Sequence, residues 1–190
     1  MTNSKLLPEL AKTDKKAAIM EAALELFATQ GFHSTSISQV AKKAGISKGS
    51  IYTYFDSKQA LLEGIVFNAV DMGEEYMEEF FNEPTPEDAL RKVIETNMMI
   101  MVSQKQYMGF MTSLMLQPDA YNSVKEKLAE RSRKSIKKME EVFTQKGSAN
   151  PKIETRIFLA TLDGIGIHYL AEYEDYPLED IKASLIERYC

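Results

Sequence analysis

The stretch from Ser34 to Leu62 constrains the fold most, because it holds two helix starts separated by one glycine-containing turn. Ser36 is followed three residues later by Gln39, which is the spacing of a reciprocal capping box. Gly45 suits the left-handed residue that ends a helix, and Ser47 suits the N-cap of the next. Two short helices joined by a tight turn, over about residues 36–55, form a helix-turn-helix, whose second helix enters the DNA major groove.

The second of these helices, residues 48 to about 54, has an apolar inner side and a polar outer side. Ile51 and Phe55 are four residues apart and therefore share the inner face. Lysine, serine, threonine and tyrosine occupy the other positions, and these residue types suit contacts with phosphates and base edges. From spacing alone, a solvated polar face on a small helical hairpin explains the pattern as well as DNA binding does.

A longer set of residues around this stretch has a specific match. The set comprises Gly31-Phe32, Thr35-Ser36-Ile37, Val40-Ala41, the run from Ala44 to Gly49, the run from Ile51 to Phe55, Lys58 and Leu61-Leu62. Over about residues 15–65, the chain resembles the N-terminal domain of the TetR family of bacterial transcriptional regulators. Beyond these residues, only the helical layout and the length are similar to that family.

The resemblance implies a role for each matching residue. Ser36 and Ser47 would be helix caps that meet phosphates. Lys48, Gly49, Ser50 and Thr53 would face the bases, with Gly49 allowing a close approach. Tyr52, Tyr54 and Lys58 would hold the DNA backbone. Two half-sites about 34 Å apart would then require a homodimer on a near-palindromic operator.

Hydrophobic periodicity predicts an all-α chain of about nine helices without strands. We expect a flexible tail at 1–12, a three-helix DNA-binding head at 13–58, and a helical domain at 59–190. A long helix from Ser57 to about Phe81 would connect the two parts. By the resemblance, the second domain would bind a small-molecule effector and form the dimer.

Composition narrows the class of protein. Residues 1–60 contain eight lysines and five acidic residues, a net charge of +3, so the remainder of the chain carries −8 of the total of −5. A basic head on an acidic body is oriented toward a polyanion such as DNA. Cys190 is the single cysteine, and neither a metal site nor a cofactor motif is evident. No apolar run is long enough for a membrane span, so we expect a cytoplasmic protein. The resemblance implies a bacterial or archaeal source and a location at the nucleoid when the protein is bound to DNA.

Methionine is frequent in the expected effector domain. The chain has eleven methionines, and six of them fall within residues 98–115. Methionine lines adaptable hydrophobic sites, but periodicity alone favours an ordinary methionine-rich core. The ligand cavity that the resemblance implies for this region makes the two interpretations about equal. His168 alone is more typical of a packed histidine than of a ligand contact. Our candidates for effector binding are Asn97, Met98, Met101, Tyr107, Met111, Met115, Tyr121, Asp163 and His168.

The helix from Asn150 to about Tyr173 is apolar on several sides, so it must be covered on several sides. In a domain of this size, we expect one of the covers to be a second subunit. The resemblance implies that this helix and the last one form a four-helix bundle across the dimer. Our interface candidates are Ile157, Ala160, Gly164, Ile167, Leu178, Ile181, Leu185 and Tyr189.

These features together predict a homodimeric DNA-binding regulator, a repressor by the family's usual direction, released by a small hydrophobic effector. An enzyme is not expected, because the sequence has no phosphate-binding glycine loop, Ser-His-Asp pattern or zinc-ligand spacing. The alternative is a ligand-binding or protein-interaction module of the same fold that has lost DNA binding. The presence of Lys48, Tyr52, Tyr54 and Lys58 argues against that alternative.

Overall fold

The computed structural model describes residues 15–172 and 174–190, and these residues form nine α-helices and no strand. The helices are α1 (Lys15–Gln30), α2 (Ile37–Lys43), α3 (Lys48–Tyr52), α4 (Lys58–Phe80), α5 (Pro86–Ser103), α6 (Lys105–Met115), α7 (Pro118–Gln145), α8 (Pro151–Glu172) and α9 (Leu178–Tyr189). The all-α prediction is confirmed. The predicted tail, residues 1–12, lies outside the described residues.

The helices begin and end at local signals in the sequence. At the start of α5, Thr85 Oγ1 accepts a hydrogen bond from the Asp88 N–H at 3.1 Å, and Pro86 occupies the first turn. At the start of α8, Asn150 Oδ1 accepts from the Ile153 N–H at 3.4 Å. The chain leaves α7 through Gly147, whose φ of +83° suits glycine and few other residues.

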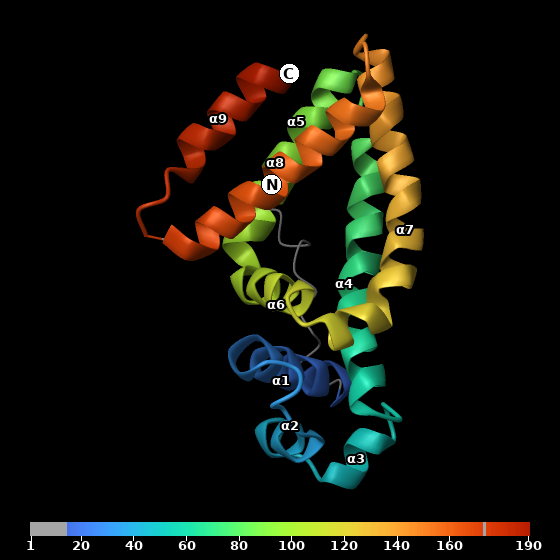
Figure 1. Cartoon of the computed structure of the whole chain (residues 1–190), viewed down its shortest axis with the longest axis vertical. Helices are drawn as coiled ribbons and strands as arrows, with labels where there is room; N and C mark the ends of the chain where they lie inside the picture. The colour runs from blue at the N-terminus through green and yellow to red at the C-terminus, as the bar shows by residue number, and fades with distance from the viewer. Residues whose placement is uncertain (1–14, 173) are drawn as a thin grey trace.

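The helices form an elongated molecule with the head at one end (Figure 1). The short helices α2 and α3 lie at the tip, below α1. The two longest helices, α4 and α7, run side by side from the head toward the other end, where α5, α8 and α9 lie. With 23 residues, α4 is about 35 Å long at ~1.5 Å per residue, so it connects the two ends of the molecule.

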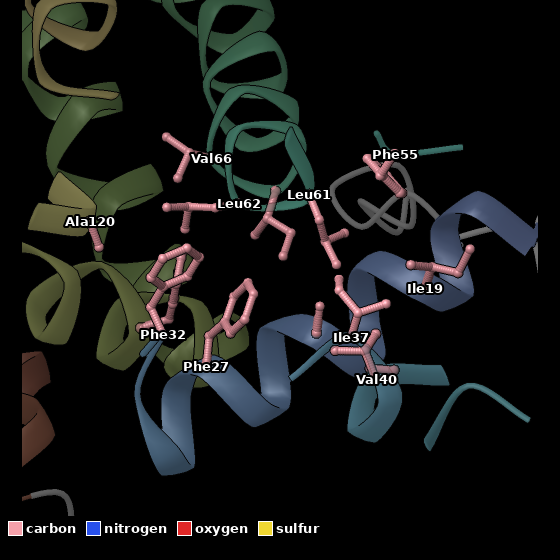
Figure 2. Packing of buried hydrophobic residues seen from close by; sticks show 14 of the residues in the cluster. Ile19, Phe27, Phe32, Ile37, Val40, Phe55, Leu61, Leu62, Val66 and Ala120 are labelled. Carbon is pink, nitrogen blue, oxygen red and sulfur yellow. The ribbon is translucent and has the colours of Figure 1, made fainter. Parts of the chain in front are cut away.

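One of the two hydrophobic cores fills the head, and we call it the head core (Figure 2). Phe27 lies at its centre, with its ring 5.2 Å from the ring of Phe32 and 6.2 Å from that of Phe110 in α6. Its members come from α1, α2, α3, α4, α6 and the start of α7. The head core therefore extends across the predicted domain boundary at residue 58, and the head has no separate core of its own.

The second core, which we call the distal core, lies at the opposite end. It joins Phe80 of α4 to buried residues of α5, α8, α9 and the second half of α7. The ring of Phe158 contacts those of Tyr189 and Phe143, with centroid distances of 4.9 and 5.7 Å. Among the helices of the described residues, none is long and apolar enough to cross a membrane.

Candidate functional site

The turn between α2 and α3 forms as the sequence predicts. Ser36 Oγ accepts from the Gln39 N–H at 3.3 Å, and Gln39 Oε1 accepts from the Ser36 N–H at 2.7 Å, which confirms the capping box. Gly45 has a φ of +68°. The Ile46 N–H then reaches back to the Ala41 carbonyl at 3.0 Å, the bond that closes a Schellman motif.

Helix α3 is held from inside and presents its other sides to solvent. Ser47 caps it by accepting from the Ser50 N–H at 3.1 Å, and Ile51 and Phe55 are buried in the head core. Lys48 and Gly49 are exposed, and so are Tyr52 and Tyr54, at 44% and 41%. The predicted base-facing and backbone-facing residues of α3 and the turn after it therefore lie on accessible surface.

The hydroxyls near α3 are partly engaged within the helix. The Ser47 and Ser50 Oγ atoms are 2.8 Å apart, and Thr53 Oγ1 donates to the Ser50 carbonyl at 2.7 Å. The single hydroxyl donor of Thr53 is therefore used within the protein, and the side chain has its methyl group and an acceptor lone pair left for contact with another molecule.

Lys58 lies differently from the predicted contact with DNA. Its Nζ donates to the carbonyls of Phe32 at 2.8 Å, Thr35 at 2.9 Å and His33 at 3.3 Å. The ammonium group also lies over the Phe32 ring, 4.4 Å from its centroid, and burial lowers the pKa of Lys58. Because an ammonium has three N–H donors, the loop after α1 uses all of them. Lys58 thus holds this loop on α4, a role that the sequence pattern did not predict.

Further contacts that the sequence did not predict attach the head to the rest of the chain. Gln117, between α6 and α7, accepts from the Phe32 N–H at 3.2 Å and donates to the Ser113 carbonyl at 3.2 Å. Gln59 of α4 donates to Ser123 of α7. The loop after α1 is therefore held from two sides, by Lys58 and by Gln117.

A cavity of about 760 Å³ lies between α4, α5, α7 and α8. Its walls are mainly apolar and include Val70, Phe80, Val93, Ile100, Ile136, Met139, Leu159 and Leu162. Its polar lining includes Glu74, Thr96, Asn97, Tyr121, Arg131, Ser132, Ser135, Arg156 and Asp163. Pockets of about 300–1,000 Å³ with apolar walls and a few polar groups typically hold small organic molecules.

One polar group of this cavity is buried without a partner among the described residues, and a second, which is exposed, has a raised pKa. Asn97 Oδ1 is buried and has no hydrogen-bond partner among the described residues. The carboxylate of Asp163 remains partly exposed, but the surrounding side chains desolvate it and raise its pKa. Buried polar atoms are usually paired, so an unpaired one beside a cavity indicates a place for water or a ligand.

Comparison with known proteins assigns the head to a family. Residues 19–65 match the model of the bacterial regulatory proteins of the tetR family. The head of this protein is therefore similar to the N-terminal domain of TetR-family regulators. The uncharacterized HTH-type transcriptional regulator YuxN of Bacillus subtilis is 53% identical over 49 residues, which are 26% of this chain and 17% of YuxN. This match therefore spans less than a fifth of that relative.

Two further comparisons extend over nearly the whole chain. The fatty acid metabolism regulator protein of Bacillus subtilis is 24% identical over 184 residues, covering 93% of this chain and 94% of that protein. The crystal structure of the transcriptional regulator FadR from Bacillus subtilis in complex with stearoyl-CoA superposes with a TM-score of 0.73 at 21% identity, covering 90% and 95%. This likeness shows that the fold is shared. All three of these proteins are described as regulators, in line with the expectation that the chain is not an enzyme.

The predicted effector residues separate into two groups. Asn97, Tyr121 and Asp163 line the cavity. The other six lie elsewhere: Met98 and Met101 are buried in the distal core, Tyr107 and Met111 pack on the head core, and Met115 and His168 are exposed. None of the four predicted methionines lines the cavity, whereas Met139, which does, was not predicted. The cavity arginines were missed because Arg131 lies on the charged face of α7 and Arg156 is exposed on α8, so solvation explains both equally well.

The predicted dimer residues also separate. Ile157 and Ile167 of α8 are 50% and 53% exposed, and Ala160 and Gly164 lie between them on the same helix, exposed and half-buried respectively. Ile181 of α9 is half-buried against the distal core. The remaining α9 candidates, Leu178, Leu185 and Tyr189, are buried within the chain itself. For these three, periodicity identified an apolar face correctly but not its partner, which is the distal core of the same chain.

Proposed function

We propose that this protein is a homodimeric transcriptional repressor that binds a near-palindromic operator through α3 and is released by an apolar small molecule. The observation that carries the proposal is the arrangement of α3. Its inner face is fixed by Ile51 and Phe55, while Lys48, Tyr52 and Tyr54 are exposed together. A helix-turn-helix with this exposure can dock its second helix in the major groove.

In this proposal, the outward residues divide the work of recognition. Lys48, Gly49, Ser50 and Thr53 face base edges and set the operator sequence, with the Thr53 methyl suited to thymine. Tyr52 and Tyr54 hold the sugar–phosphate backbone, together with Ser36 and Ser47 at the helix starts. Lys58 acts indirectly, because its ammonium positions the loop after α1.

The apolar outer face of α8 supports the proposed dimer. Ile153, Ile157 and Ile167 are each about half exposed on a chain whose other large aliphatic residues are mostly buried. A second copy would cover this face and place two α3 helices on adjacent half-sites. Ile157→Glu should convert the dimer to a monomer in analytical ultracentrifugation, whereas Lys152→Glu, at another exposed position of α8, should not.

The cavity between α4, α5, α7 and α8 supports the proposed effector site. Its volume and apolar walls suit a molecule with a hydrocarbon chain. A regulator of the same fold has been crystallised with stearoyl-CoA, which favours a fatty acyl compound as the effector class. A ligand that prefers one position of α4 would shift the population of head orientations and release the operator.

Selection of bound sequences from a random DNA pool tests the proposal directly. We expect a palindrome to be enriched by the wild-type protein, and its enrichment to be lost with Lys48→Ala or Tyr52→Ala and weakened by salt. Lys152→Ala, which removes a distant exposed lysine, is the matched control. A folded dimer that enriches no sequence would reject the operator part of the proposal and favour a ligand-binding module of the same fold.

A further inference from the structure

Helices α4 and α7 are joined along one edge by a row of cations from α7. The row consists of Lys127 over the ring of Phe67 at 4.2 Å, Arg131 with Asp71 and Glu74, Lys134 with Glu78 at 3.6 Å, and Lys138 over the ring of Phe81 at 5.1 Å. The cations are spaced at i, i+4, i+7 and i+11, so they share one face of α7. The row fixes the position of α4 relative to α7.

Arg131 makes the strongest contact in this row. Its Nη1 is 2.6 Å from Asp71 Oδ1, and its Nε and Nη2 donate to the two oxygens of Glu74 at 2.9 and 2.5 Å. The bidentate bond with Arg131 lowers the pKa of Glu74. Of the four cations in the row, Arg131 is the one that also lines the cavity. The same guanidinium therefore faces α4 and the proposed effector site.

The cavity has a second guanidinium on its α8 wall. Arg156 lines the cavity and has no carboxylate within ion-pair distance among the described residues. Guanidinium groups bind carboxylates and phosphates with paired hydrogen bonds, and they do so more strongly where water is partly excluded. Two such groups beside apolar walls suit a ligand with a hydrocarbon chain and an anionic group.

We infer that Arg131 senses the anionic group of the effector and exchanges its bonds with Asp71 and Glu74 for bonds with that group. This inference rests on the proposed function, since it assumes that the cavity is the effector site. The exchange releases α4 from α7 at the level of the cavity. The N-terminal part of α4 carries Leu61, Leu62 and Lys58, which hold the head, so a change in α4 reaches the DNA-binding surface.

Asp163 supports the opposite ligand charge. Its carboxylate lines the same cavity from α8, would repel an anion and would attract a cation. Glu74 also lines the cavity, but its carboxylate is paired with Arg131. We favour the anion because Arg156 has no carboxylate partner among the described residues, and because Arg131 is bonded to charged groups of the helix that must move. A cationic ligand is tested alongside the anionic ones.

Four probes with the same ten-carbon chain separate these possibilities: decanoate, decyl phosphate, decanol and decyltrimethylammonium. Binding to the purified full-length protein would be measured by calorimetry below the micellar concentration, without DNA. We expect decanoate or decyl phosphate to bind about tenfold or more tightly than decanol, the gain typical of a charge-assisted hydrogen bond. The preferred anion distinguishes a carboxylate from a phosphate effector.

Three variants assign the effect to Arg131. Arg131→Gln should reduce the preference for the anion by about tenfold and leave decanol binding unchanged. The double variant Asp71→Asn/Glu74→Gln should strengthen anion binding several-fold, because the competing carboxylates are gone. Arg133→Gln is the matched control, since Arg133 is exposed on the same helix and does not line the cavity. Hydrogen exchange of the α4 amides beside Asp71 should increase with the anion in the wild type and not in Arg131→Gln.

The possible results separate the role of Arg131 from the role of the cavity as an effector site. Equal binding of decanol and the anions, or an anion preference that survives Arg131→Gln, would overturn the role of Arg131 and leave the cavity as an effector site. Tightest binding of decyltrimethylammonium would overturn it in favour of Asp163. Binding of none of the probes would reject the cavity as a site for such ligands, and with it this inference. None of these results affects the operator selection, which needs no ligand.

Discussion

The head core and the distal core differ in which helices they share and in how completely their polar groups are paired. Among the described residues, only α4 and α7 contribute buried side chains to both cores. The cavity lies between the cores: Val70 and Tyr121 pack on the head core, whereas Phe80, Val93 and Met139 belong to the distal core. A ligand at this position bears on the two helices that hold the halves of the molecule together.

The buried polar atoms show the second difference. In the head, Thr35 is 1% exposed, and its Oγ1 donates to the Gly31 carbonyl at 2.9 Å. Toward the other end, the oxygens Asn97 Oδ1 and Thr155 Oγ1 are buried without a partner among the described residues. An unpaired buried oxygen costs free energy that a paired one does not. The buried Thr35 hydroxyl of the head therefore has a hydrogen-bond partner within the protein, whereas Asn97 Oδ1 beside the cavity can still accept a hydrogen bond from another molecule.

Phe110→Ala should have the largest effect of the changes considered, because it removes the α6 ring that joins the head core to the rest of the chain. Phe110 is 2% exposed and stacks on Phe27. Truncation of a buried phenylalanine typically costs about 3–5 kcal/mol of unfolding free energy. Urea unfolding followed by circular dichroism measures the loss. Operator affinity should fall with it, because the head loses its anchor.

Two controls locate this effect. Met115→Ala, on the same helix but 58% exposed, should change stability by less than about 0.5 kcal/mol. Phe158→Ala in the distal core should cost a similar 3–5 kcal/mol but leave the head anchored. If both phenylalanine variants weakened operator binding equally at temperatures where they remain folded, the two cores would not be distinct in function.

Two glycines of α4 allow the packing of the head core to be compared with that beside the cavity on a single helix. A Cβ at Gly64 would lie 2.8 Å from the Phe55 ring in the head core, whereas a Cβ at Gly73 beside the cavity meets nothing within 4 Å. Gly64→Ala should therefore cost about 1–3 kcal/mol through overpacking. Gly73→Ala should stabilise the protein by about 0.5–1 kcal/mol, because alanine favours the helix. Thermal unfolding of the two variants would contradict the comparison if both shifted in the same direction.

Local signals in the sequence were sufficient to predict the helices and the turn of the head. The Ser36 capping box and the Ser47 cap depend on neighbouring residues alone, and the structure confirms both. The exposed residues of α3 could be predicted for the same reason, since burying Ile51 and Phe55 decides which sides face outward.

The residues that depend on distant partners could not be predicted. The ammonium of Lys58 finds three carbonyls 23 to 26 residues away, and Gln117 finds Phe32 across 85 residues. The apolar face of α9 could pack against a second subunit or against the core of its own chain. The spacing of apolar residues in the sequence is the same in both cases, so it could not show which of the two covers the face. Arg131 and Arg156 could not be distinguished from solvated residues without knowing that a cavity lies beside them.

Gln117→Ala tests whether the loop after α1 is held from the side of α6 and α7 as well as by Lys58. The change leaves the half-buried Phe32 N–H without its acceptor and should cost about 1–2 kcal/mol. Gln145→Ala, at an exposed position of α7, is the matched control and should have little effect. Hydrogen exchange of the Phe32 amide, measured by NMR, should accelerate in Gln117→Ala only. Unchanged exchange would leave Lys58 as the sole restraint.

The smallest expected effect is a pH dependence of the contact between α4 and α7. The hydrogen bond from Arg131 holds the pKa of Glu74 below its ordinary value of 4.5. A carboxylate with a depressed folded pKa contributes stability above pH 4.5 and loses it as the pH falls through the folded pKa. Because the Glu74 side chain is about half exposed, its contribution should be below about 1 kcal/mol.

The difference in unfolding free energy between wild type and Glu74→Gln should therefore be constant from pH 7 to about 5 and shrink below 4.5. Glu79→Gln, also exposed on α4, should not show this change. If the difference in unfolding free energy persisted at pH 3.5, the ion pair between Glu74 and Arg131 would not stabilise the contact. The contact between α4 and α7 would then depend on the packing of their apolar faces.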